Sequence, residues 1–148
     1  MKPDAGRFLE VAAAHLMMRT APALTDGYEQ ASTMVLGTML LEVKQELDRA
    51  AARRVEENAA LRSLFAEAVP AVDDTDLRRR LDEAAQGEDT SLVVSDLEQG
   101  NAELRALLIE LHAHVEELES AAARTIDEAI WRELIASTER RRALIGSF

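Results

Sequence analysis

The sequence contains no cysteine and few aromatic residues, and both shortages limit what the protein can be. Without cysteine there is no disulfide, no thiolate nucleophile and no thiolate metal ligand. Aromatic residues make up only 3% of the 148 residues, so leucine, methionine, alanine and valine have to fill the core. Phe8, Phe65 and Trp131 are expected as isolated large anchors. This composition predicts helices packed against helices.

Long hydrophobic runs are also missing. The most apolar stretch, 34–43, is about half as long as a membrane-spanning helix and contains Glu42. The apolar run 11–18 follows Asp4 and Glu10 and does not have the form of a signal peptide. We therefore expect no membrane insertion and a cytoplasmic location.

Charge, in contrast, is abundant and unbalanced. Hydrophobic residues make up 47% and charged residues 30%, which predicts one globular domain over residues 1–148. Strong helix formers, mainly Ala, Leu, Glu and Arg, predict an all-α fold. The net charge of -11 opposes binding to a phosphate backbone, so we expect no nucleic-acid partner.

The spacing of apolar residues predicts a bundle of four to five helices, mostly up-and-down, with one long helix. The first helix is expected to follow Pro3 and to stop before Pro22. Asp26, with Glu29 three residues later, predicts the start of the long helix, and Pro70 predicts its end. Its apolar stripe consists of Leu36, Leu40, Val43, Leu47, Ala50, Leu61, Phe65 and Ala68.

Two parts of the long helix depart from this stripe. Over 34–43 apolar residues occupy all sides of the helix, which predicts the centre of the core. Farther along, Arg54 and Asn58 stand where aliphatic residues are expected. The helix is expected to leave the bundle there, to place polar groups at an interface, or to kink.

The pattern of residues after Pro70 predicts three more helices. A short one precedes Gly87. Ser95 with Glu98, and Thr125 with Glu128, have the spacing of capping boxes and are expected to open the other two.

A short pattern occurs twice: Asn-Ala-x-Leu-Arg, a small residue, Leu and a large apolar residue, at 58–65 and at 101–108. One explanation is that amphipathic helices reuse the same residues. The other is that the two segments pack together, with Asn58 and Asn101 fixing the helix register or an oligomer interface, as a buried Asn does in coiled coils.

A narrow apolar stripe that carries polar residues suits a specific helix interface. We therefore predict a non-enzymatic protein that self-associates, as a homodimer, or docks onto another protein partner. The predicted interface residues are Leu47, Arg54, Asn58, Leu61, Phe65, Asn101, Leu104 and Leu108.

No residue pattern points to catalysis. There is no serine in a Gly-rich elbow and no Gly-rich phosphate loop, so we predict no catalytic residues and no cofactor. Glu110, His114 and Glu117 share one helix face and are the best metal candidates, but the Glu-x-x-His spacing of di-iron bundles is missing. We predict no metal site there, but half-exposed residues on a solvated face.

Arginines form three clusters, at 53–54, 78–80 and 140–142. Where clusters meet, guanidinium groups can form a pocket for phosphate or carboxylate. The alternative is surface ion pairing, with the last cluster compensating a helix end.

The segments 7–24, 56–64 and 101–112 resemble small, uncharacterised bacterial helical proteins associated with gene neighbourhoods of acyl-CoA dehydrogenases and phosphotransferase-like proteins. The resemblance covers about half of the chain and brings no catalytic residues with it. It implies an accessory role near acyl-thioester metabolism.

A second function is therefore kept open. In it, the bundle encloses a small apolar or acyl molecule, or serves as an accessory enzyme. The residues expected around such a ligand are Met34, Met39, Leu40 and Leu108.

Overall fold

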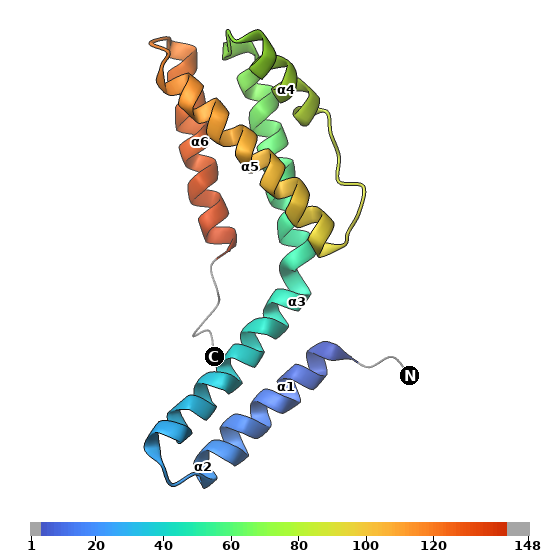
Figure 1. The fold of residues 1–148 in the computed structure, drawn as a ribbon, viewed down its shortest axis with the longest axis vertical. Helices are drawn as coiled ribbons and strands as arrows, with labels where there is room; N and C mark the ends of the chain where they lie inside the picture. Colours follow the sequence, from blue (N-terminus) through green and yellow to red (C-terminus); the bar gives the residue numbers. More distant parts are fainter. Residues whose placement is uncertain (1–3, 142–148) are drawn as a thin grey trace. The chain divides into compact units, whose positions relative to one another are not determined.

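The computed structural model describes residues 4–141 and is all-α, with no strand in that range (Figure 1). This confirms the predicted fold class and the single long helix. No helix among the described residues is long and apolar enough to cross a membrane.

The N-terminal helical segment has three parts. Helix α1 spans Ala5–His15 and is capped by Asp4, whose carboxylate accepts a hydrogen bond from the Arg7 amide. It continues as a π-helical turn, Leu16–Thr20, and a short α2, Ala21–Ala23. The expected stop before Pro22 is therefore slightly early.

Helix α3, Gly27–Ala68, is 42 residues long and is followed by a 3-10 turn over Val69–Ala71. Asp26 caps its start, since one carboxylate oxygen accepts bonds from the amides of Tyr28 and Glu29, each at 2.9 Å. The predicted start of the helix at Asp26 is thus confirmed, and the bonds come from the Asp26 side chain. The helix is continuous through the Arg54 region.

Three helices follow: α4, Thr75–Ala85; α5, Val94–Glu116; and α6, Ala121–Arg140. Their predicted capping boxes are wrong. Helix α5 starts after Val93, and the cap of α6 is Ser120, whose hydroxyl accepts from the Ala123 amide.

The chain divides into two compact units, where one domain was expected. Among the described residues, unit 1 comprises 4–50 and unit 2 comprises 51–141, so that the boundary falls within α3.

Unit 2 contains the hydrophobic core. The later part of α3, α4, α5 and α6 each bury an aliphatic or aromatic stripe, and Phe65, Leu81, Leu111 and Ile130 are fully buried there. Three-and-four spacing places each apolar stripe on one face of its helix, so the four stripes can meet in a common core.

Unit 1 has no comparable interior. In the 34–43 stretch, Met34, Val35, Leu36, Met39 and Val43 are exposed by between 39% and 57%. The prediction that this stretch is the centre of the core is therefore wrong. Apolar residues on all sides of a helix indicated several neighbours, but α1 is the helix that packs against it within the unit (Figure 1).

Candidate functional site

Unit 2 holds a group of buried and partly exposed polar side chains on helices α3, α5 and α6 and just after α6. We call it the Glu57 cluster. Its members are Arg54, Glu57, Asn58, Asn101, Arg105, Ser137 and Arg141.

Glu57 is the centre of the cluster and is only 1% exposed. Arg141, just beyond the end of α6, donates from Nε and Nη2 to the two carboxylate oxygens at 2.8 and 2.7 Å. Arg54, one turn before Glu57, donates at 2.8 Å, and the Ser137 hydroxyl donates at 3.3 Å. Both oxygens are therefore occupied by donors from the same chain.

These donors determine the protonation of Glu57. Burial alone would raise the pKa of its carboxyl group, but the hydrogen bonds and charges of Arg141 and Arg54 outweigh burial and lower the pKa to about 2. Glu57 is therefore ionised at neutral pH.

Asn58 and Asn101 connect α3 to α5 beside Glu57. The Asn101 amide donates to Asn58 Oδ1 at 2.9 Å, and Asn58 donates to Asp89 at 3.0 Å. Arg62 also donates to Asp89, at 2.8 Å. The two copies of the repeated pattern thus meet through their asparagines, within one chain.

Arg105 is the least compensated cation of the cluster. It donates to the Ser137 hydroxyl at 2.7 Å. Desolvation, followed by the charge of Arg141, lowers the pKa of its guanidinium group. The Ser137 hydroxyl links Arg105 to Glu57, because it accepts a hydrogen bond from Arg105 and donates one to Glu57.

The chemistry available to the cluster is that of a structural network. A general base works best when its pKa is close to the operating pH, whereas the pKa of Glu57 is about 2. The hydrogen bonds of the cluster join α3 to α5 and α6, and a network of this kind specifies how helices pack.

The first and third arginine clusters do converge, but on a carboxylate of the chain itself. Arg54 and Arg141 meet at Glu57. In the middle cluster, Arg79 pairs with Asp76 and Glu83 on the same helix, which is the alternative that was expected for surface arginines. Arg142 lies outside the described residues.

Most of the predicted interface residues face the interior of unit 2. Leu61, Phe65, Leu104 and Leu108 belong to the core, and Asn58 and Asn101 are buried with them. Arg54 is half-buried, and Leu47 is 56% exposed. An interface on the described surface would therefore have to use other residues together with Leu47.

The metal candidates already have other neighbours. A carboxylate oxygen of Glu110 lies 2.5 Å from Arg80, and His114 Nε2 lies 3.0 Å from Asp73. Glu117 is exposed at the end of α5. No group of three potential ligands able to hold a metal ion occurs among the described residues.

The second candidate site is the surface of unit 1. Helices α1 and α3 form an antiparallel hairpin, because residue 13 meets residue 37 while Glu10 pairs with Lys44 at 3.2 Å. The buried residues of the unit are all small: Ala13, Ala21, Gly37 and Ala50. A Cβ on Gly37 would lie 2.3 Å from Met17 Cγ, so glycine permits the close approach of the helices.

The hairpin has two unlike sides. In an antiparallel pair of right-handed helices, the residue immediately before a contact position such as Ala13 or Gly37 lies on one side of the pair, and the residue immediately after it lies on the other. Residues three, four, seven or eleven positions away along the same helix return to the same side. The preceding side is apolar on both helices, and we call it the apolar face. Its residues are Leu9, Ala12, Leu16, Leu36, Leu40, Val43 and Leu47.

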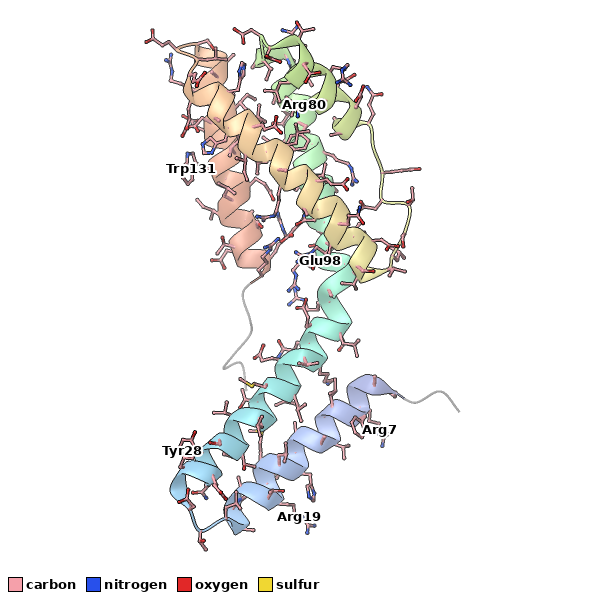
Figure 2. All side chains as sticks on the ribbon, in the orientation of Figure 1. Arg7, Arg19, Tyr28, Arg80, Glu98 and Trp131 are labelled. Atoms are coloured by element: carbon pink, nitrogen blue, oxygen red, sulfur yellow. The ribbon has the colours of Figure 1, made fainter. Side chains whose placement is uncertain are left out.

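Leu36, Val43 and Leu47 are 54%, 53% and 56% exposed, so the apolar face is open in the single chain. Phe8 on α1 and Met18 on the π-helical turn are also exposed, by 72% and 77%. Figure 2 shows Tyr28, 82% exposed, at the turn between the helices. Contiguous exposure of this kind marks interaction surfaces.

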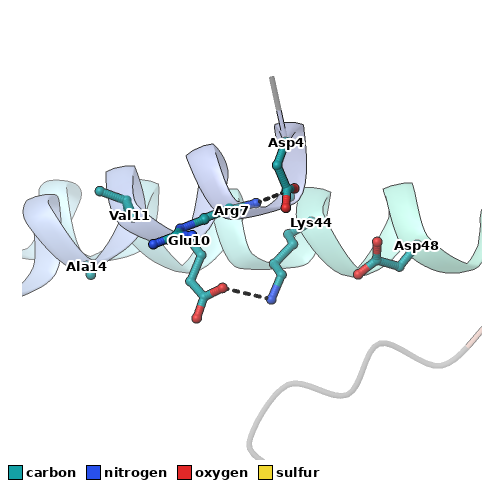
Figure 3. Close-up of a pocket in the computed structure, with 8 residues that line it drawn as sticks. Asp4, Arg7, Glu10, Val11, Ala14, Lys44 and Asp48 are labelled. Carbon is teal, nitrogen blue, oxygen red and sulfur yellow. Dashed lines mark hydrogen bonds and ion pairs between the residues drawn. The ribbon is translucent and has the colours of Figure 1, made fainter. Parts of the chain in front are cut away.

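The opposite side of the hairpin is polar. A pocket there is lined by the charged residues Asp4, Arg7, Glu10, Lys44 and Asp48 together with Gly6, Val11 and Ala14 (Figure 3). The Glu10–Lys44 pair spans the two helices at this pocket. The hairpin as a whole is therefore amphipathic.

The residues expected around an apolar ligand are divided between the two units. Met34 and Met39 are exposed on unit 1, and Leu108 belongs to the core of unit 2.

Comparison with known proteins gives no functional information on the chain. No family model, no curated protein and no solved structure matches the chain.

Proposed function

We propose that the chain is a non-enzymatic interaction protein, in which unit 2 is a packed helical body and the apolar face of unit 1 binds protein. The observation that carries the proposal is the contrast between the two units. Unit 2 buries its large aliphatic side chains, whereas unit 1 buries only alanine and glycine.

The apolar face has the composition of a helix-packing surface. Leu36, Leu40, Val43 and Leu47 follow one another at spacings of four, three and four residues. This is the spacing of helices that pack side by side at a shallow angle. A helical partner can therefore fit along the hairpin.

The polar residues support a structural assignment for unit 2. Its most buried carboxylate is bonded to two arginines and a serine of the same chain, and its pKa is far below neutral pH. Such a group holds helices together and is poorly suited to proton transfer.

Thiol labelling tests whether the apolar face is available to another protein. Because the chain has no cysteine, single substitutions report one position each. We expect Val43→Cys in the full chain at high dilution to react with a bulky maleimide about as fast as Gln45→Cys on the polar side. Val115→Cys, in the core of unit 2, provides the slow reference.

The outcome that overturns the proposal is slow labelling. If Cys at position 43 reacts as slowly as Cys at position 115 at every protein concentration, the chain covers the face itself, and no other protein can bind there.

A further inference from the structure

We infer that the apolar face of unit 1 binds a second copy of this chain, so that two hairpins form an intermolecular four-helix bundle. This inference rests on the proposed function and names its partner. Four observations carry it: the small interior of the hairpin, its charge, its self-complementary surface and its size.

The hairpin has too little interior to hold itself together. Small folds are usually stabilised by disulfides, a metal or association. The chain has no cysteine, and no metal-holding group occurs among the described residues. Association would supply such stabilisation, because covering the exposed Leu36, Val43 and Leu47 would give the hairpin a core of large side chains.

The charges favour a second copy over contact through unit 2. Residues 1–50 carry five basic and seven acidic side chains, a net charge of -2 out of -11. Residues 51–148 carry the other -9. Two hairpins can therefore meet with little repulsion, whereas two copies of the strongly acidic part repel each other.

The face is also self-complementary. Its seven residues are all aliphatic, so it can meet an identical face without an unpaired charge. Most soluble homodimers use such an isologous interface, in which the same patch serves both copies. Two hairpins joined in this way have the architecture of a four-helix bundle.

The size of the face approaches that of a standard dimer interface. Helical residues 5–23 extend over about 28 Å, and two helices side by side are about 20 Å wide. The projected area is therefore on the order of 550 Å², and side-chain relief increases the accessible area further. A standard interface buries about 800 Å² on each partner.

Light scattering of the full chain with a matched pair of variants tests the inference. Val43→Glu places a carboxylate on the apolar face, and Gln45→Glu places the same group on the polar side two residues later. We expect the wild type and Gln45→Glu to have twice the 16.3 kDa mass of one chain. An unpaired charge in the interface should raise the dissociation constant of Val43→Glu by about 100-fold or more, leaving one-chain mass.

Circular dichroism and the dye ANS distinguish the failures. Val43→Glu should keep the unit 2 unfolding transition, so that loss of the dimer is not loss of the whole fold. A dimeric Val43→Glu would overturn the inference. A monomeric wild type that binds ANS, with binding lost in Val43→Glu, would overturn the second copy as partner but support the proposed function. A monomeric wild type that binds no ANS would overturn both.

Discussion

Replacing Glu57 with Gln should remove most of what the buried ion pairs contribute to unit 2. The variant keeps the shape of the side chain and one oxygen acceptor, but it removes the charged partner of Arg141 and leaves Arg54 paired with Glu98 alone. The pKa moves from 4.5 to about 2 on folding, and each pH unit corresponds to about 1.4 kcal/mol, which gives about 3 kcal/mol. Since Arg141 is 39% exposed, solvent screening reduces the expected loss to about 2 kcal/mol.

The dependence on pH identifies the cause of this loss. The folded-state pKa of Glu57 is lowered, so the stabilisation is complete above pH 4.5 and disappears as the pH falls towards about 2. The difference between wild type and Glu57→Gln should therefore be largest at neutral pH and shrink below pH 4.5.

Urea unfolding followed by Trp131 fluorescence measures the difference in the right unit, because Trp131 is the only tryptophan and lies in α6. Glu56→Gln is the matched control, since the neighbouring Glu56 is exposed. Equal stability of the two variants at pH 7, or a loss in Glu57→Gln that is unchanged at pH 2.5, would refute the reasoning.

Two further predictions concern the helix contacts. Asn58→Ala leaves the Asn101 amide without its acceptor and should lower the free energy of unfolding by about 1–3 kcal/mol. Replacing both asparagines with Leu should cost less than the sum of the two single replacements. Additive losses of stability in urea unfolding would contradict this. Gly37→Val should reduce the helicity of the hairpin in circular dichroism because its Cβ meets Met17, and Met17→Ala in the same chain should restore part of it; an unchanged spectrum for the single variant would show that the close approach is not needed.

The helices could be predicted from the sequence because apolar periodicity and the Asp26 cap act locally. The sequence could not predict which part of an apolar stripe other helices cover. Val43 and Leu61 occupy the same predicted stripe, yet Val43 is 53% exposed and Leu61 is 3% exposed. The spacing is the same in both places, and only the tertiary arrangement of the other helices separates them.

The polar site was only partly predictable. The repeated pattern brought out Asn58 and Asn101, whose contact lies 43 residues apart in the sequence. Glu57 was missed because a glutamate on a helix is ordinarily solvated, and its main partner, Arg141, is 84 residues away. Its one local signal was Arg54, three residues earlier, at a position where an aliphatic residue was expected.

Hydrogen exchange of the hairpin amides at several chain concentrations tests the central claim most directly. If the hairpin depends on a second chain across its apolar face, amides of residues 27–47 should exchange slowly in concentrated wild type and faster on dilution or in Val43→Glu, while unit 2 amides stay unchanged. Equally slow exchange of residues 27–47 at all concentrations, in wild type and Val43→Glu alike, would contradict the account.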